Sequence, residues 1–315
     1  MTTPEDFKKE WFSSAETVAA HTSGSTGAPK QIRLLKSDMR ASAHATNRFF
    51  GLNGQSVFVC PLSPDYIAGK MMAVRAWEAG TEPVFLIPSN SPCLSGHASL
   101  LAIVPSQIPA LLQAVKNGQF NVDAVLIGGA ELPATSRKGL LGAGINAWES
   151  YGMTETCSHI ALRHVTQDYF KAMPGVTFGT DVRGCLVADV PHLSVKHIVT
   201  NDIIRLINPQ CFVWLGRYDN VINTGGIKVQ PEQLEKQLME FGLSGPFYIS
   251  SLPDPKWGQR IVLVAERQTC PADTELNEIF NALPGRYLIP KQIIRVDALP
   301  RTSNGKLRRL TPDKL

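Results

Sequence analysis

The sequence contains no closely spaced pair of cysteines. None of its six cysteines belongs to a C-x-x-C motif, which argues against a zinc site and against a disulfide framework. Scattered thiols in a chain of 315 residues are typical of a reducing compartment, so we expect a cytoplasmic protein. The first residues, MTTPEDFKKEWF, carry charges where a signal peptide would need an apolar run.

Long apolar runs and a strong charge of one sign are also absent. The most apolar stretch, Leu100 to Val115, is interrupted by Pro105 and Pro109, which excludes a membrane span there. The net charge of +4 is too small to indicate a nucleic-acid partner, although it suits an anionic substrate. An apolar content of 43% indicates a globular protein with a sizeable core, and a homo-oligomer is compatible with it.

Helix-like and strand-like segments alternate over the first 150 residues. After one or two short helices in 1–20, we expect helices at 36–50, 67–79, 111–116 and from about 134, and strands at 56–62, 83–87 and 123–127. This alternation predicts an α/β fold with a mostly parallel sheet. Ligands of such sheets bind at the carboxyl ends of the strands. Gly128–Ala130 follows the predicted strand 123–127, and Tyr151–Glu155 follows the run Ile145–Trp148, so both fall at such ends.

The pattern changes after residue 178. Short β-like runs over 185–190, 197–199, 203–207 and 212–215 predict a small β subdomain. A helix near Pro231, strands at 247–251, 261–265 and 292–296, and a helix at 274–283 then predict a small α+β domain. We therefore expect a large N-terminal domain over 1–218 and a small C-terminal domain over 219–315.

Residues 21–30, HTSGSTGAPK, form the most distinctive stretch. Its glycines allow backbone N–H groups to turn toward an anion, and its hydroxyls and Lys30 add donors and charge. Phosphate is the expected ligand, and a plain polar surface loop is the alternative. The spacing of Gly24 and Gly27 does not fit a Walker-type loop.

Three further stretches carry candidate chemistry. In Tyr151-Gly152-Met153-Thr154-Glu155, a ring for a purine, a hydroxyl for a phosphate and a carboxylate for Mg²⁺ follow one another, although a core tyrosine at a strand end is the alternative. Asp202 and Arg217 could hold the two hydroxyls of a ribose, or form a surface ion pair that contributes little. Lys306, within PRTSNGKLRR, is either a cation for a phosphate or part of a solvated tail.

These stretches occur in a specific order. HTSGSTGAPK, GGAEL, YGMTE, TND, GRYDNVINTGGIKVQPEQLE and PRTSNGKLRR together resemble the adenylate-forming superfamily of acyl-CoA synthetases, adenylation domains and luciferases. The resemblance covers residues 21–309. It implies an enzyme that couples a carboxylate to ATP as an acyl-adenylate, with release of pyrophosphate, and then transfers the acyl group to a thiol. It therefore implies ATP, Mg²⁺ and CoA.

The resemblance also implies roles for individual residues. The β- and γ-phosphates would contact the loop residues Thr22, Ser23, Gly24, Ser25, Thr26, Gly27 and Lys30. The adenine and acyl pocket would be formed by Gly128, Gly129, Ala130, Tyr151 and Gly152, with Thr154 at the α-phosphate and Glu155 on Mg²⁺. The ribose would be held by Asp202 and Arg217. Lys306 would bridge the carboxylate and the α-phosphate.

The family resemblance further implies a mobile C-terminal domain. Asp219 corresponds to the hinge, and Gly225 and Gly226 would line the CoA tunnel after Lys306 has left the site. Two departures stand out. Only about twenty residues precede the phosphate loop, so we expect a truncated first subdomain, and the usual T-G-D is T-N-D here, with Asp202 retained.

Within the superfamily, the chain is most similar to the o-succinylbenzoate–CoA ligase branch of menaquinone synthesis. GGIKVQPEQLE and PLSPDYIAGKMMAVR carry this similarity. The second carboxylate of such a substrate needs a cation, for which Lys70 is the first candidate and Arg75 the second, unless both are solvated charges on a helix. The alternatives are an adenylation enzyme that loads another aryl or amino acid on CoA or a carrier protein, and a non-catalytic adenylate-binding module.

Overall fold

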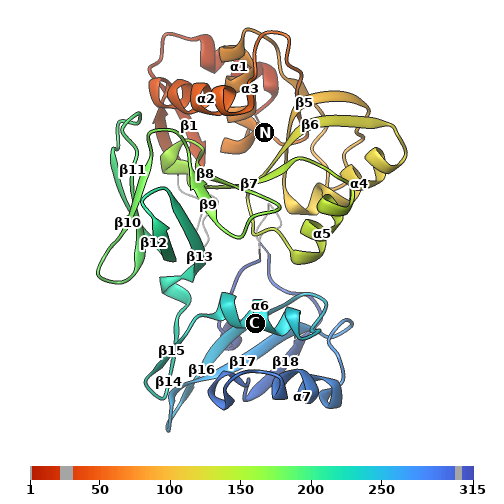
Figure 1. Ribbon diagram of the computed structural model, residues 1–315, viewed down its shortest axis with the longest axis vertical. Helices are drawn as coiled ribbons and strands as arrows, with labels where there is room; N and C mark the ends of the chain where they lie inside the picture. The colour runs from red at the N-terminus through yellow and green to blue at the C-terminus, as the bar shows by residue number, and fades with distance from the viewer. Residues whose placement is uncertain (1, 22–30, 302–306) are drawn as a thin grey trace. The chain divides into compact units, whose positions relative to one another are not determined.

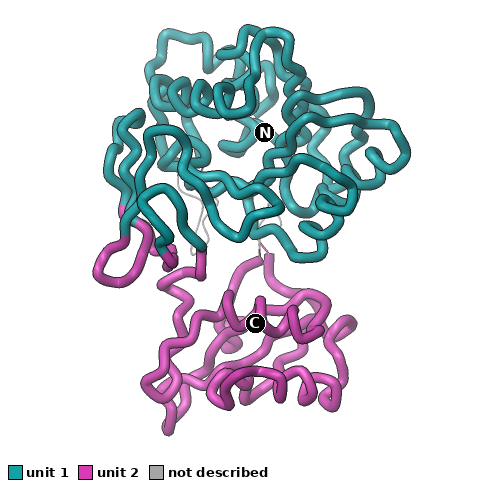
Figure 2. The backbone as a smooth tube through the Cα atoms, viewed as in Figure 1, with its two compact units in different colours: residues 1–179, 187–198, 206–213 teal, residues 180–186, 199–205, 214–315 magenta. Residues whose placement is uncertain are grey.

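A computed structural model describes residues 2–21, 31–301 and 307–315 of the chain (Figure 1). By contacts the chain divides into two compact units (Figure 2). Unit 1 comprises residues 1–179, 187–198 and 206–213, and unit 2 comprises residues 180–186, 199–205 and 214–315. The predicted domain boundary at 218/219 stays a prediction.

The first part of unit 1 is a helix–hairpin–helix segment with its own core. α1 (Pro4–Phe12) begins with a capping box between Thr3 and Asp6. β1 (Thr17–His21) and β2 (Gln31–Leu35) pair antiparallel, with His21 opposite Gln31. α2 (Lys36–Phe50) follows at once. β1 was not expected, because residues 1–20 were predicted to be helical.

The parallel part of the large sheet follows from the predicted alternation of strands and helices. Its strands are β3 (Phe58–Cys60), β4 (Val84–Phe85), β5 (Gly96–Ile103), β6 (Phe120–Ile127) and β7 (Ala147–Gly152), which lie in the order β4-β3-β5-β6-β7 and are all parallel. Its helices are α3 (Ile67–Ala79), α4 (Ile108–Lys116) and α5 (Ala134–Gly142). Leu111 of α4 and Leu140 of α5 belong to the apolar cluster that covers one face of these strands.

The same sheet continues with antiparallel strands, so it is parallel over only part of its width. These strands are β8 (His159–His164), β9 (Phe170–Ala172), β10 (Thr177–Thr180), β11 (Cys185–Asp189), β12 (His197–Asn208) and β13 (Cys211–Arg217). The sheet runs β10-β11-β12-β13-β9-β8-β7 before it enters the parallel part, which gives eleven strands among the described residues. β7–β8, β8–β9 and β9–β13 are antiparallel. The prediction of a mostly parallel sheet with a small β subdomain is therefore corrected: the expected β region is part of the large sheet, which is only partly parallel.

The C-terminal part of unit 2 is a second mixed sheet with two helices. Its elements are β14 (Ile222–Thr224), β15 (Ile227–Val229), α6 (Pro231–Glu240), β16 (Phe247–Asp254), β17 (Gly258–Glu266), α7 (Asp273–Asn281) and β18 (Gln292–Val296). The strand order is β15-β14-β17-β16, and β18 pairs parallel with β17. Leu234 of α6 and Phe280 of α7 share one apolar cluster with Leu263 of β17, so both helices cover the same face.

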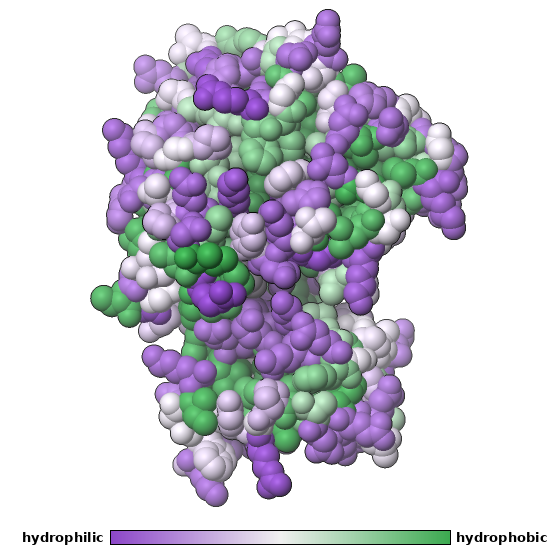
Figure 3. Space-filling model, viewed as in Figure 1, coloured by the Kyte–Doolittle hydropathy of each residue, from purple (hydrophilic) through white to green (hydrophobic). Residues whose placement is uncertain are grey.

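On the face of the molecule shown in Figure 3, apolar residues form patches between the hydrophilic residues. Among the described residues, we find no helix with the length and apolar character that a bilayer crossing requires.

Candidate functional site

Two groups of predicted site residues lie at the carboxyl ends of neighbouring strands in unit 1. β6 ends at Ile127 and is followed by Gly128, while the parallel strand β7 pairs Glu149 with Ile127. The hydroxyl of Ser150 donates to the carbonyl of Ile127 over 2.9 Å, and a side chain at Gly128 would lie 2.7 Å from that hydroxyl. The structure thus brings Gly128 beside Ser150, the residue before Tyr151, so both groups lie at the same edge of the sheet, as the strand-end rule predicts.

Tyr151 occupies an aromatic environment. Its ring centroid lies 5.1 Å from that of Phe212, edge to face, and 5.7 Å from that of Phe170. The side chain is half-buried. Such packing fixes the orientation of the ring at the end of β7.

Thr154 and Glu155 lie in a short 3₁₀ turn, η2 (Thr154–Thr156), directly after β7. Glu155 is exposed and makes no hydrogen bond or ion pair with any residue that the structure describes. No group of three or more metal-binding side chains occurs among the described residues. An oxygen ligand of this kind fits a Mg²⁺ ion that takes most of its ligands from phosphates and water.

The loop that carries Glu155 is fixed by a buried threonine and a tight turn. Thr156 is 1% exposed, and its hydroxyl accepts from the backbone N–H of Met153 and contacts the carbonyls of Met153 and Ser158. Cys157 has φ 60° and ψ −38°, and the N–H of Ser158 donates to the carbonyl of Thr156 over 2.6 Å. These values describe a γ-turn of the rare, strained kind. Nothing in the sequence pattern indicated this turn.

Buried charges on α3 differ from the prediction. Lys70 is 3% exposed; its ammonium lies 3.6 Å from Glu10 Oε2 and 4.2 Å from the centroid of the Phe7 ring. Arg75 is 2% exposed, and its Nη2 donates to Ser158 Oγ. Neither side chain is a solvated charge on a helix face, which corrects that alternative. Lys70 connects α3 to α1, whereas Arg75 has no carboxylate partner among the residues that the structure describes.

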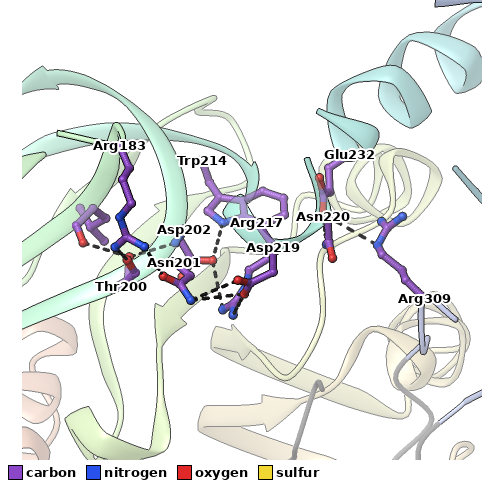
Figure 4. Close-up of polar contacts among 11 residues, drawn as sticks. Arg183, Thr200, Asn201, Asp202, Trp214, Arg217, Asp219, Asn220, Glu232 and Arg309 are labelled. Atoms are coloured by element: carbon purple, nitrogen blue, oxygen red, sulfur yellow. Dashed lines mark hydrogen bonds and ion pairs between the residues drawn. The ribbon is translucent and has the colours of Figure 1, made fainter. Parts of the chain in front are cut away.

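Asp202 and Arg217 come together in unit 2, as Figure 4 shows. Asp202 lies on β12 and is 7% exposed, so its carboxylate is buried rather than at the surface, although it does pair with Arg217. Its Oδ1 accepts from Trp214 Nε1 over 3.3 Å and lies 3.5 Å from Arg217 Nη1. The guanidinium of Arg217 also contacts Asp219 Oδ2 at 3.1 Å, so it bridges two carboxylates.

Neighbouring side chains that the sequence analysis did not single out complete this arrangement (Figure 4). Asn201 donates to the carboxylate of Asp219 over 3.3 Å. Arg183 donates to Asn201 Oδ1 over 2.8 Å, and its guanidinium lies 5.2 Å from the centroid of the Tyr218 ring. Because Asn201 is the residue that departs from the usual T-G-D, its contact with Asp219 gives that departure a structural role.

The glycines predicted to line a CoA tunnel form a tight hairpin in unit 2. Gly225 (φ 59°) and Gly226 (φ 83°) connect β14 to β15, with Thr224 opposite Ile227. Positive φ at both positions requires glycine or asparagine. A side chain at Gly225 would also lie 2.7 Å from the ring of Trp257.

The residues that follow Lys306 are anchored to α6. Arg309 forms a bidentate ion pair with Glu235 and lies 3.8 Å from Glu232 Oε1, which accepts from Asn220 over 2.5 Å (Figure 4). Burial raises the pKa of Glu235, and the charge of Arg309 opposes this rise. Arg301 and Leu307 form an antiparallel bridge. Lys306 itself, like Thr22, Ser23, Gly24, Ser25, Thr26, Gly27 and Lys30, lies outside the described residues.

His159, the first residue of β8, gives the fold a pH dependence that can be measured. Burial, followed by the charge of Arg75, holds the pKa of His159 well below its ordinary value of 6.5. The unfolded chain therefore binds a proton near pH 6.5 that the folded chain does not bind, and the free energy of unfolding decreases as the pH falls below that value. The slope from this one group reaches at most about 1.4 kcal/mol per pH unit.

Urea unfolding of the wild type and of His159→Gln between pH 7.5 and pH 5 measures this effect. Glutamine keeps polar groups at the position but does not titrate, so we expect the variant to lose less stability on acidification. Equal losses for both proteins would contradict a neutral, buried histidine.

Comparisons with known proteins agree with the fold. A family model described as AMP-binding enzyme matches residues 10–190. A probable 2-succinylbenzoate–CoA ligase of Mycobacterium tuberculosis is 29% identical over 316 residues, which cover 91% of this chain and 81% of that protein. A 2-succinylbenzoate–CoA ligase of Staphylococcus aureus is 25% identical and is covered over 65% of its length.

Solved structures show the same similarity. An acyl-CoA synthetase (AMP-forming)/AMP-acid ligase II-like protein from Dyadobacter fermentans is 30% identical, with a TM-score of 0.63 and coverage of 96% of this chain and 91% of that one. The o-succinylbenzoate CoA synthetase of Bacillus subtilis in complex with the acyl-adenylate intermediate has a TM-score of 0.80 at 20% identity, with coverage of 92% and 67%. The chain belongs to the AMP-binding enzyme family.

Proposed function

We propose that this protein activates a carboxylic acid with ATP as an acyl-adenylate and then transfers the acyl group to CoA, in the cytoplasm where both are supplied. Membership of the AMP-binding enzyme family is the observation that carries the proposal. The arrangement of Asp202, Trp214 and Arg217 in one unit, and of Gly128, Tyr151 and Glu155 in the other, supports it.

The described residues offer suitable groups for the nucleotide. Asp202 would accept from a ribose hydroxyl, and Arg217 would donate to the second one. The ring of Tyr151 would stack on adenine between Gly128–Ala130 and Gly152, with Thr154 at the α-phosphate. Glu155 would hold Mg²⁺, which neutralises phosphate charge when bound. The loop 22–30 would hold the β- and γ-phosphates.

Two half-reactions at one site would require the chain after the hinge to move. We place the hinge at Asp219 and the moving domain at 219–315. Lys306 would bridge the carboxylate and the α-phosphate in the first half-reaction, and the Gly225-Gly226 hairpin would line the path of the CoA thiol in the second. Because the carboxylate attacks the α-phosphorus and pyrophosphate leaves, neutralising charge is the main task of these side chains.

For the acyl substrate, o-succinylbenzoate is the best-supported candidate. The similarity to 2-succinylbenzoate–CoA ligases of two organisms points to it. The second carboxylate of this acid would be bound by Arg75, because this guanidinium is buried and has no acidic partner among the described residues. Lys70, the first candidate from the sequence, is already compensated by Glu10.

Pyrophosphate release tests the activity and the substrate together. The protein is incubated with ATP, Mg²⁺ and one of o-succinylbenzoate, benzoate, succinate or a medium-chain fatty acid, with and without CoA. Release with o-succinylbenzoate and a CoA-dependent thioester supports both parts of the proposal. Release with another acid discards the menaquinone assignment. No release with any acid, while ATP still binds, favours a carrier-protein partner or a non-catalytic module.

Replacing Arg75 with leucine should raise the KM for o-succinylbenzoate about a hundredfold, because a charge-assisted contact with the second carboxylate is lost. The KM for ATP should change little. Lys70→Met is the comparison, and we expect it to lower stability while leaving the KM for o-succinylbenzoate nearly unchanged. The opposite pattern, with the large KM increase in Lys70→Met, would assign the carboxylate to Lys70.

A further inference from the structure

A chain of polar side chains, all buried except the half-buried Ser158, connects α2 to Arg75 through the start of β8. Arg75 donates to Ser158 Oγ, Ser158 Oγ lies 3.2 Å from His159 Nδ1, and His159 Nε2 lies 3.2 Å from Thr46 Oγ1. The hydroxyl of Thr46 donates to the carbonyl of Ser42 over 3.0 Å. Thr46 is 0% exposed and His159 7%. All five residues lie in unit 1.

The positions of the protons in this chain follow from the partners. The single proton of Thr46 goes to the carbonyl of Ser42, so Thr46 must accept from His159 Nε2–H. A neutral His159 then has an unprotonated Nδ1, which accepts the proton of Ser158. Ser158 Oγ therefore offers its lone pairs to Arg75 and to no other described donor. Each hydrogen bond in the chain therefore has a defined donor and acceptor, and the bond from Thr46 to the carbonyl of Ser42 fixes all the others.

These hydrogen-bond directions matter because the guanidinium of Arg75 has few other contacts with described polar groups. Its Nε has no hydrogen-bond partner among the described residues. Asn47 Nδ2 donates to the backbone carbonyl of Arg75, which fixes the backbone and leaves the guanidinium unaffected. The orientation of the guanidinium plane thus depends on Ser158, and the orientation of Ser158 depends on His159.

We propose that Thr46 and His159 are positioning residues that orient Arg75 through Ser158 for recognition of the second carboxylate of the substrate. This inference rests on the proposed role of Arg75. A bidentate guanidinium–carboxylate contact requires the correct plane, so disorder in that plane weakens binding of dicarboxylates and leaves nucleotide chemistry intact.

Thr46→Val tests the inference, because valine keeps the shape and removes the hydroxyl. We expect the KM for o-succinylbenzoate to rise about tenfold, with kcat and the KM for ATP within about twofold of the wild type. Thr46→Ser should restore most of the wild-type KM. Ser42→Ala is the matched control: it removes a buried hydroxyl one helical turn away and keeps the carbonyl that accepts from Thr46.

The tautomer of His159 provides a second readout that does not depend on turnover. Long-range ¹H–¹⁵N spectra of the ¹⁵N-histidine-labelled protein should show His159 protonated at Nε2 at neutral pH, and Thr46→Val should perturb that signal. A proton at Nδ1 would overturn the inference, because Ser158 would then have to accept from both neighbours.

Arg75→Leu, measured in parallel, separates this inference from the proposed function. If Arg75→Leu leaves the KM for o-succinylbenzoate unchanged, the role of Arg75 is wrong and the positioning role falls with it. If Arg75→Leu raises this KM while Thr46→Val and His159→Gln do not, the proposed function stands and the positioning role is wrong.

Discussion

Replacing Lys306 with alanine should reduce acyl-adenylate formation about a thousandfold, while thioester formation from supplied acyl-adenylate should change by less than about threefold. The reason is charge. In the proposed first half-reaction, negative charge develops between the attacking carboxylate and the α-phosphate, and a positioned cation that stabilises it contributes several kcal/mol. In the second half-reaction the adenylate already exists, so Lys306 has no further task.

The two half-reactions can be measured separately. Pyrophosphate release reports the first, and consumption of synthetic acyl-adenylate in the presence of CoA reports the second. Lys314→Ala is the control, because it removes an exposed cation from the same C-terminal segment. If Lys306→Ala slowed both half-reactions equally, Lys306 would not be specific to adenylation.

Gly152→Ala should destabilise the protein by about 3 kcal/mol or more and abolish activity. An added Cβ at this position would lie 2.2 Å from the carbonyl oxygen of Ser158 and 2.7 Å from the Cα of His159. Both contacts are with backbone, in the irregular pair where β7 meets β8, so a side-chain rotation cannot relieve them. Overpacking of this kind displaces the loop that carries Glu155 and the start of β8.

Urea unfolding of Gly152→Ala beside Gly142→Ala measures this effect. Gly142 is the last residue of α5 and has no heavy atom within 4 Å of an added Cβ. Alanine there should leave stability unchanged or raise it by up to about 1 kcal/mol. Similar stabilities of the two variants would show that β7 and β8 can separate at this point.

The helices were the most predictable elements. α2 and α3 occupy the predicted ranges 36–50 and 67–79 because each ends at a glycine in the left-handed region, Gly51 and Gly80, which local sequence reveals. β18 also has the predicted range, 292–296. For β6 and β7, the rule that parallel strands present ligand sites at their carboxyl ends correctly placed Gly128 at the same sheet edge as the end of β7.

Elements defined by distant partners were not predictable in the same way. β5 (Gly96–Ile103), which lies between β3 and β6 in the sheet, was not predicted. Its apolar residues run on toward those of α4, so the local sequence does not separate the strand from the helix. The runs 197–199 and 203–207 proved to be one strand, β12, whose intervening residues include the buried Asp202. A buried charge in a strand is visible only when its partners, here Trp214 and Arg217, are known.

The same limit applies to the charges on α3. In the sequence, Lys70 and Arg75 are two cations in the same predicted helix, and Lys70 was the first candidate for binding the second carboxylate. Both side chains are buried, and their partners distinguish them, because Glu10 compensates Lys70 and no described acid compensates Arg75. The directed chain from Thr46 to Ser158 joins three elements that are distant in sequence, so no local pattern could indicate it.

The bridge between Arg301 and Leu307, together with the ion pair of Arg309 with Glu235, has an implication for how this segment can evolve. The bridge pairs the two residues that flank positions 302–306, and the ion pair holds the following chain to α6. Lengthening a loop between fixed ends costs only a few tenths of a kcal/mol per added residue, so folding imposes little selection on its length. If related proteins keep the same number of residues between these two positions, we infer that selection acts on how far Lys306 can extend, and not on folding.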